Sequence, residues 1–477
     1  MRILIIGGVA AGSSAAAKLS RLKPDWDLVI YEETEDISYS SCNMPYFIGD
    51  LVDDPEQIAP RDPAYFKDHY NTEVYLHHRV EKINPGDKTI QVHNLKEDRT
   101  FEDHYDKLLI ATGARASIPP IEGVDQANVF SLRKFEDMVS IHNRMTCCMP
   151  EGSSVVVIGS GFIGLEMVEN FVRLGYPVKL LVSDQVSKLS KELTPYLEAE
   201  LIRYGVEIIK NARAVKIQGK KVHLKDGRVI DGDFVLLATG IKPNIELAED
   251  IGLKIGSFGA IETNKQMETS LPDIYAAGDV VQTQSLIDGS PIYLPLGSTA
   301  NKMGRVVADN MAGNKVEFPG IVGTNIFKLF DLEVGSTGLS EAQAKEKGYK
   351  TLIYYHIHRS HYASHGGEPI LVKAVVDRDK EELLGTEVIG FTGVKNRLDI
   401  YASFISFHGN IHDLEYLDTA YAPPFSTVRD VALYTGMIGA NLLDKKAPSQ
   451  EGKIDENFLT YIQNRPSSKL MTPINFS

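Results

Sequence analysis

The chain has 477 residues, of which 43% are hydrophobic and 24% charged, a balance typical of globular proteins. At roughly 150 residues per domain, this length indicates about three domains. The formal net charge of -14 excludes nucleic acid and anionic membranes as main partners, because both would be repelled.

The amino terminus lacks the basic region and cleavage site of a signal peptide, and no apolar run approaches the roughly 18 residues that a membrane span needs. The only cysteines are Cys42, Cys147 and Cys148, and adjacent cysteines pair poorly, so a disulfide framework is not expected. We therefore expect a cytoplasmic protein.

The first predicted unit is a strand, a glycine turn, a helix of small residues and a second strand, over residues 2–33. Gly7 and Gly12 fit the dinucleotide-binding pattern, although Val9 replaces its middle glycine. Glu32 closes the second strand, where a carboxylate can accept both ribose hydroxyls of an adenosine. The segment predicts a first Rossmann-like nucleotide site.

Cys42 follows this second strand by about ten residues, in the segment SYSSCNMPYFIGD. That separation can bring its sulfur towards a flavin ring, and a helix beginning here would lower the pKa of the thiol. The alternative is a buried small hydrophobic residue. Cys147 and Cys148 lack the Cys-x-x-Cys spacing, and we expect them to be structural or incidental.

The same pattern returns over residues 154–182, where Gly159, Gly161 and Gly164 have the full G-x-G-x-x-G spacing. The sequence therefore predicts a second dinucleotide site. The following strand ends without a carboxylate or an arginine at the ribose position, so the choice between NADH and NADPH stays open. Asp184 slightly favours NADH.

An Ala-Thr-Gly turn follows a buried strand in each nucleotide unit, at Thr112 and Gly113 and again at Gly240. Further along, Asp279 ends a strand after Ala-Gly, and its carboxylate could bond the ribityl chain of a flavin. From about Gly323 the pattern changes to alternating strands followed by a helix, which predicts an α+β third domain.

Eight motifs together resemble the pyridine nucleotide-disulfide oxidoreductases with one active-site cysteine, and most of all the coenzyme A-disulfide reductases. The motifs are GGVAAG, SYSSCNMPYFIGD, LLIATGA, GSGFIGLE, ATGIKPN, IYAAGD, STANKMGR and AYAPPFS. The resemblance implies an α/β fold with two Rossmann-like domains, bound FAD, NADH or NADPH as electron donor, no metal, and a homodimer whose active sites borrow residues from the second subunit.

On this resemblance the chain divides into four parts. We expect an FAD-binding domain of residues 1–115 and 245–322, an NAD(P)H-binding domain of residues 116–244, a C-terminal dimerisation domain of residues 323–446, and a polar tail of residues 447–477 to which we assign no function.

The resemblance also implies residue roles. Cys42 would be the redox-active sulfur and, with no Cys-x-x-x-x-Cys motif, would form a mixed disulfide with coenzyme A. Tyr421 matches the tyrosine of the second subunit that lies near the sulfur and can hydrogen-bond or protonate the leaving thiolate. Phe162 would gate the flavin, and Glu166 would steady the nicotinamide or a flavin-side lysine.

Coenzyme A carries phosphates that its pocket must neutralise. The residues that we expect to contact it are Ser38, Ser41, Arg21, Arg61, Lys67 and Tyr362. The segment around Tyr362 departs from the family pattern, because the tyrosine is offset and His361 and His365 intrude. That departure puts the substrate contacts of the second subunit in doubt.

Three other functions stay open. A persulfide or polysulfide reductase could use the same Cys42 and coenzyme A, although no rhodanese domain follows. An NADH oxidase or peroxidase would cycle Cys42 through a sulfenic acid, but Ala10 stands where those relatives carry a histidine. A flavoprotein that senses NADH without rapid turnover would leave Cys42 unexplained.

Overall fold

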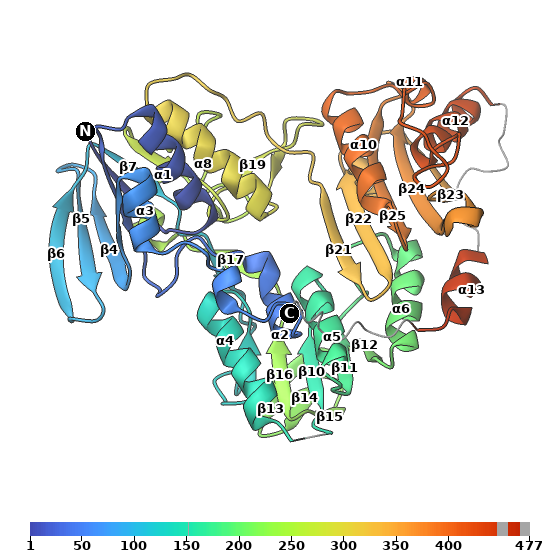
Figure 1. The fold of residues 1–477 in the computed structure, drawn as a ribbon, viewed down its shortest axis with the longest axis horizontal. Coiled ribbons are helices and arrows are strands. Elements are labelled where there is room, and N and C mark those ends of the chain that lie inside the picture. The colour runs from blue at the N-terminus through green and yellow to red at the C-terminus, as the bar shows by residue number, and fades with distance from the viewer. Residues whose placement is uncertain (151, 446–456, 468–477) are drawn as a thin grey trace. The chain divides into compact units, whose positions relative to one another are not determined.

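The computed structural model describes residues 1–150, 152–445 and 457–467 (Figure 1). The chain divides into two compact units. Unit 1 comprises residues 1–117, 132–146 and 240–321, and unit 2 comprises residues 118–131, 147–239 and the chain from Val322 onward. Of the expected tail of residues 447–477, the structure describes residues 457–467, which fall in unit 2; residues 447–456 and 468–477 lie outside the described residues.

Unit 1 is built on a five-stranded parallel sheet in the order β18-β7-β1-β2-β3. Its strands are β1 (Arg2–Ile6), β2 (Asp27–Tyr31), β3 (Thr72–Tyr75), β7 (Lys107–Ile110) and β18 (Ile274–Ala276). Helix α1 (Ala10–Leu22) connects β1 to β2, as the sequence predicts, and packs against α8 (Gly297–Met311).

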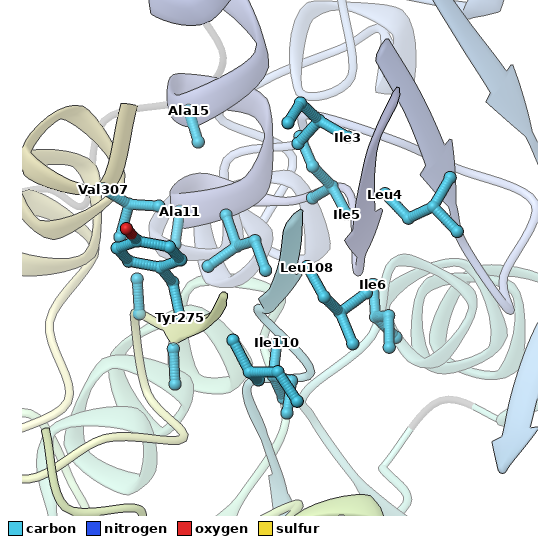
Figure 2. Close-up of a cluster of buried hydrophobic side chains, with 14 of the residues drawn as sticks. Ile3, Leu4, Ile5, Ile6, Ala11, Ala15, Leu108, Ile110, Tyr275 and Val307 are labelled. Carbon is cyan, nitrogen blue, oxygen red and sulfur yellow. The ribbon is translucent and has the colours of Figure 1, made fainter. Parts of the chain in front are cut away.

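The core of unit 1 lies between the sheet and these two helices (Figure 2). After Arg2, strand β1 is a continuous buried apolar run, as expected in a parallel sheet that is covered on both faces. Small residues let the helices approach closely: a Cβ at Gly304 of α8 would lie 2.2 Å from the carbonyl oxygen of Ala11. The small residues predicted for the helix after the first glycine turn therefore serve helix packing.

Two antiparallel additions complete unit 1. A three-stranded sheet contains β4 (His78–Asn84), β5 (Thr89–Asn94) and β6 (Arg99–His104). Strands β8 (Ala114–Ala116) and β17 (Ile241–Pro243) pair where the chain leaves unit 1 and returns, and the amide of Ser117 donates a 2.9 Å hydrogen bond to the carbonyl of Gly240. The remaining elements are η1 (Ser41–Asn43), α2 (Met44–Ile48), η2 (Pro55–Gln57), α3 (Pro63–Tyr70), α4 (Phe135–Asn143), α7 (Glu246–Asp250), β19 (Thr283–Gln284) and β20 (Pro291–Ile292). The π-helical turn η3 (Arg144–Cys148) crosses from unit 1 into unit 2.

Unit 2 contains a second parallel sheet in the order β12-β11-β10-β16-β9. Its strands are β9 (Val129–Ser131), β10 (Val155–Ile158), β11 (Val178–Val182), β12 (Glu207–Lys210) and β16 (Phe234–Leu237), with helices α5 (Phe162–Arg173) and α6 (Thr194–Arg203), the turn η4 (Lys191–Leu193), and an antiparallel sheet of β13 (Ala214–Gln218), β14 (Lys221–Leu224) and β15 (Val229–Asp231).

The rest of unit 2 is an antiparallel sheet in the order β21-β22-β25-β24-β23 with helices. Its elements are β21 (Asn325–Leu329), β22 (Leu332–Gly338), α9 (Glu341–Glu346), β23 (Thr351–Arg359), η5 (Ala363–His365), β24 (Pro369–Asp377), β25 (Leu383–Gly390), α10 (Val394–Ser406), α11 (Ile411–Leu414) and α12 (Val431–Leu443). The predicted fold class, two Rossmann-like units and an α+β domain, is confirmed.

A further helix, α13 (Asn457–Asn464), lies in the stretch where the sequence indicated only a polar tail, and it packs against α6 (Figure 1). Among the described residues, no helix has the length and apolar character needed to cross a bilayer.

Candidate active site

The first glycine turn joins β1 to α1, and two of its glycines leave no room for a side chain. Gly7 has a φ of +98°, and a Cβ there would lie 2.4 Å from the carbonyl oxygen of Ala111. A Cβ at Gly12 would lie 1.9 Å from the carbonyl oxygen of Gly7. These contacts bring the start of α1 close to the carboxyl edge of the sheet, where dinucleotides bind in this architecture.

Glu32 lies against this turn at the end of β2. Its carboxylate accepts a 2.8 Å hydrogen bond from the amide of Gly8, and the hydroxyl and amide of Thr34 donate to its other oxygen at 2.8 and 3.0 Å. The residue is only 6% exposed. Each carboxylate oxygen has two acceptor sites, and three of the four are used, so the group keeps one for a hydroxyl donor at the edge of the turn.

The second glycine turn repeats this geometry between β10 and α5. Gly159 has a φ of +108°, and a Cβ there would lie 2.4 Å from the carbonyl oxygen of Ala238, while a Cβ at Gly164 would lie 2.2 Å from that of Gly159. At Gly161, the N-cap of α5, no heavy atom of the described chain lies within 4 Å of an added Cβ. The turn therefore has open space where a diphosphate needs close backbone approach.

The loop after β11 is bonded to this second turn. The hydroxyl of Ser160 donates to the carbonyl of Gln185 at 3.0 Å, and the amide of Ser187 donates back to the carbonyl of Ser160 at 3.1 Å. The side-chain amide of Gln185 also donates to the carbonyl of Leu189 at 2.6 Å. Asp184 is exposed at the start of this internally bonded loop.

Arg133 is a residue of the site that the sequence reasoning missed. Its guanidinium donates a 2.6 Å hydrogen bond to Asp279 and a 2.8 Å bond to the carbonyl of Ala114, beside the turn of Gly113. The hydroxyl of Tyr293 donates to the carbonyl of Asp279 at 2.7 Å. No motif surrounds Arg133 in the sequence. The only indication was an arginine between the two expected glycine turns, in the segment that returns to unit 1.

Thr112 and Gly240 lie just before β8 and β17, the two short strands that pair with each other. The hydroxyl of Thr112 donates to the carbonyl of Asn244 at 2.8 Å, and the side-chain amide of Asn244 donates to the carbonyl of Thr112 at 2.8 Å. Gly240 has a φ of +105°. The Thr112 hydroxyl is thus engaged in joining these connections.

Cys42 is exposed in the turn η1, two residues before α2. The expected helix does begin at this segment, but it contains only five residues. The turn is fixed from both sides, because the amide of Asn43 donates to the carbonyl of Ser40 and the amide of Ser40 donates to the carbonyl of Ile58. A buried packing role for Cys42 is therefore wrong.

The cations expected to contact phosphates have different surroundings. Arg61 lies 3.5 Å from the hydroxyl of Ser38 and 5.6 Å from the centre of the Tyr65 ring. Burial and a hydrogen bond with Tyr65 raise the pKa of Tyr70 against the opposing charges of Arg61 and Arg21, which places both arginines near one phenol. Lys67 is bonded to Glu73 instead.

Tyr421 and Tyr362 are brought together in unit 2. A hydrogen bond with the hydroxyl of Tyr362 raises the pKa of Tyr421. The two side chains are partly exposed, at 49% for Tyr421 and 37% for Tyr362. Tyr362, whose surroundings depart from the family pattern, and Tyr421, the predicted catalytic residue, therefore form one pair.

Phe162 and Glu166 occupy the first turns of α5. The ring of Phe162 lies 5.4 Å from that of Phe327 in β21. Burial, and next the charge of Glu169, raise the pKa of Glu166 to about 7. A carboxyl group with this pKa exchanges its proton near neutral pH.

These features place the protein in the class of α/β proteins with two Rossmann-like units, each with a glycine turn at the start of a helix. The family model for pyridine nucleotide-disulphide oxidoreductases matches residues 1–303, and the model for the dimerisation domain of the same family matches residues 324–432. The chain therefore belongs to the pyridine nucleotide-disulphide oxidoreductase family, and the predicted family and enzyme class are confirmed.

Three known proteins illustrate the relationship. The chain is 39% identical over 444 residues to the CoA-dependent NAD(P)H sulfur oxidoreductase of Pyrococcus furiosus, covering 90% of this chain and 97% of that protein. It is 30% identical over 434 residues to the coenzyme A disulfide reductase of a Staphylococcus aureus strain, covering 90% and 98%. The structure of an NAD-dependent persulfide reductase from A. fulgidus superimposes with a TM-score of 0.90 at 34% identity, covering 93% of this chain and 84% of that one.

Proposed function

We propose that the protein is an FAD-dependent NAD(P)H:disulfide reductase that acts on coenzyme A disulfide through Cys42. The observation that carries the proposal is the exposed Cys42 on a fixed turn of unit 1, the unit with the first glycine turn and Glu32. The sequence offers no cysteine at the spacing of an internal redox disulfide. An external thiol must then supply the second sulfur.

FAD fits the residues of unit 1. The glycine turn would receive its diphosphate, Glu32 its adenosine ribose, and Asp279 with Arg133 its ribityl and phosphate region. Gly113 and Thr112 would border it from the neighbouring turn. When bound, FAD passes two electrons from the nicotinamide to a disulfide sulfur.

NADH or NADPH fits the second turn in unit 2. Gly159, Gly161 and Gly164 would receive its diphosphate at the start of α5, and Asp184 would meet its adenosine ribose. Phe162 would have to leave Phe327 to admit the nicotinamide. Glu166, protonated for part of the time near pH 7, would donate a hydrogen bond to it.

The sulfur chemistry balances with one protein thiol. The Cys42 thiolate attacks one sulfur of coenzyme A disulfide, which breaks the substrate S–S bond, forms a mixed disulfide and releases one coenzyme A thiolate. Two electrons then cleave the mixed disulfide, which restores the Cys42 thiolate and releases the second coenzyme A. Tyr421 would donate a proton to a leaving thiolate.

A homodimer would supply Tyr421 and Tyr362 from the second copy. The matched dimerisation domain supports this assembly. The same domain exposes several large apolar side chains, which a second copy would cover. They are Phe407, Tyr416, Phe425 and Val428.

The phosphates of coenzyme A would meet Arg21 and Arg61, with Ser38 and Ser41 beside Cys42. Arg61 and Arg21 lie near Tyr70, and this cluster offers charge and an aromatic face to a nucleotide. Lys67 would contribute only if the ligand displaced Glu73.

A second candidate function is the reduction of coenzyme A persulfide or polysulfide sulfur with release of sulfide. The comparisons favour it, because the sequence identity is 39% to a CoA-dependent sulfur oxidoreductase and 30% to a coenzyme A disulfide reductase. Both candidates use Cys42 and coenzyme A. They differ in whether the accepting sulfur leaves as a thiolate or as hydrosulfide.

The first experiment is the intact mass of the purified protein before and after dithiothreitol, followed by NADH turnover with coenzyme A disulfide and with coenzyme A persulfide. We expect a coenzyme A adduct that is absent from Cys42→Ser and present in the Cys147→Ser/Cys148→Ser control. Retained disulfide turnover in Cys42→Ser would overturn the proposal. Faster turnover with the persulfide would select the second candidate.

A further inference from the structure

Tyr362 lies on a closed loop, residues 360–368, between β23 and β24. The amide of Ser360 donates to the carbonyl of Glu368 at 2.8 Å, and the amide of Glu368 donates to the hydroxyl of Ser360 at 3.1 Å. Inside the loop, the amide of Gly367 donates to the carbonyl of Tyr362 at 3.1 Å. The position of the tyrosine is therefore set by the base of the loop.

A buried arginine holds one side of this base. Arg397 donates to the carbonyl of Ser360 at 2.7 Å and to the carboxylate of Asp430 at 2.5 Å. The hydroxyl of Ser426 donates to the same carboxylate at 2.7 Å. Because Ser426 follows Tyr421 by only five residues, Arg397 connects the segments that carry both tyrosines.

Helix α13 holds the other side. Arg465 donates to one carboxylate oxygen of Glu368 at 2.8 Å, and the hydroxyl of Tyr461 donates to the other at 2.5 Å. Burial raises the pKa of Glu368, but these two hydrogen bonds outweigh it and hold that pKa below its usual value. The carboxylate at the base of the loop is thus bound on both oxygens, by Tyr461 of α13 and by Arg465, which directly follows the helix.

The helix is itself anchored firmly. Phe458 and Ile462 are buried at 2% and 0% exposure. The ring of Phe458 lies 5.5 Å from that of Tyr196 in α6, and the guanidinium of Arg465 lies 4.1 Å from the ring centre of Phe391. The chain just past the helix is held as well, because Arg203 of α6 donates to the carbonyl of Pro466 at 2.9 Å.

We propose that residues 457–465, the C-terminal strap, fix the loop of Tyr362 and thereby position the Tyr362–Tyr421 pair for the disulfide substrate. The strap lies outside the residues that both family models match. Arg465 and Tyr461 are positioning residues, because they act through Glu368. The inference rests on the proposed function only for the role of the tyrosine pair in binding substrate.

The test uses Arg465→Met in the full chain, with Gln463→Met as the matched control on an exposed position of the same helix. Hydrogen exchange at the amides of Gly367 and Glu368 reads the loop directly. We expect exchange there, and the KM for coenzyme A disulfide, each to rise about fivefold, as for loss of a half-buried ion pair. Flavin reduction by NADH stays unchanged, and Arg465→Lys restores part of both effects.

Glu368→Gln tests the same contact from the loop and leaves the stacking of Arg465 on Phe391 in place. It reproduces the changes of Arg465→Met, and in a Tyr362→Phe background Arg465→Met has no further effect on KM. Unchanged exchange in both variants overturns the inference, and so does faster exchange with unchanged KM. If the wild-type protein does not reduce coenzyme A disulfide, the proposed function fails, and the exchange measurement alone then decides whether the strap holds the loop.

Discussion

Arg133 and Asp279 form an ion pair with 2.6 Å between the guanidinium and the carboxylate, although 146 residues separate them in the sequence. Both side chains are mostly buried. Asp279 follows β18, and Arg133 lies between β9 and α4. The pair fixes the direction of the Asp279 carboxylate, the group expected to bond the ribityl chain of FAD.

Arg133→Met should therefore weaken FAD binding about tenfold, because Asp279 loses the charge-assisted bond that orients it. The measurement is the flavin content of the purified protein, followed by titration of the apoprotein with FAD. Arg99→Met, at an exposed position of unit 1, is the control. Equal FAD affinity in both variants would remove Arg133 from the site.

Glu166 should make the protein less stable as the pH rises. Burial and the charge of Glu169 raise its pKa from 4.5 to about 7, so the folded state binds the extra proton between these values. Stability from this group is full below pH 4.5 and declines through pH 7, by about 3 kcal/mol at most. The Tm of Glu166→Gln should depend less on pH, whereas that of Glu207→Gln should follow the wild type; parallel curves for all three would contradict the assignment.

Asp430→Asn should destabilise the protein by about 3 to 5 kcal/mol, because it leaves the charge of Arg397 buried without an opposite charge beside it. Burial opposes ionisation of Asp430, but hydrogen bonds from Arg397 outweigh it and lower the pKa. Its contribution is therefore present above pH 3.8 and is lost as the pH falls through the lower folded value. Thermal unfolding measures the loss.

The control is Asp399→Asn, which removes the exposed ion pair between Asp399 and Lys395. Both residues lie on α10, the helix that also carries Arg397. Such a pair contributes only about 0.3 to 0.5 kcal/mol. Similar Tm shifts for the two variants would show that burial does not distinguish the pairs.

Asp184→Ser should reduce the preference for NADH over NADPH about tenfold, because the carboxylate accepts hydrogen bonds from a ribose and repels a 2′-phosphate. The bonds from Ser160 to Gln185 keep the loop in place, so kcat with NADH should change little. The ratio of kcat/KM for the two cofactors is the measurement. Lys225→Met is the control, and an unchanged ratio in Asp184→Ser would place the ribose elsewhere.

Phe425→Asp should dissociate the proposed homodimer, because it places a charge on an apolar surface where the Phe425 side chain is 76% exposed in one chain. Sedimentation velocity should show a monomer, and disulfide turnover should fall with it. Phe258→Asp alters an exposed phenylalanine of unit 1 and should sediment as the wild type does. A dimeric Phe425→Asp would move the interface away from this surface.

The two glycine turns could be predicted because each depends on backbone geometry that the sequence must satisfy locally. At Gly7 and Gly159 an added Cβ meets a carbonyl oxygen at 2.4 Å, so these positions admit only glycine. The strands beside them are uninterrupted apolar runs, which indicate a sheet covered on both faces. Local constraints of this kind can be recognised in the amino-acid sequence.

Arg133 and α13 could not be found in the same way. Arg133 acquires its role through Asp279, a contact between distant segments that no spacing records. In α13, the buried residues Phe458 and Ile462 stand four apart, but apolar spacing over so few residues in a polar stretch is too short to separate a docked helix from a tail. Both features depend on tertiary contacts.

The hydrogen bond from Ser117 to Gly240 brings together two residues that lie far apart in the sequence. The long excursion between these residues begins and ends at neighbouring points, so closing it imposes little strain on unit 1, and the entropy of closure grows only slowly with its length. A junction whose two ends lie together tolerates replacement of the chain segment between them. A chimera that takes residues 118–131 and 147–239 from a relative with the opposite cofactor preference, and keeps residues 132–146 with Arg133 in unit 1, should therefore exchange the expected nicotinamide site.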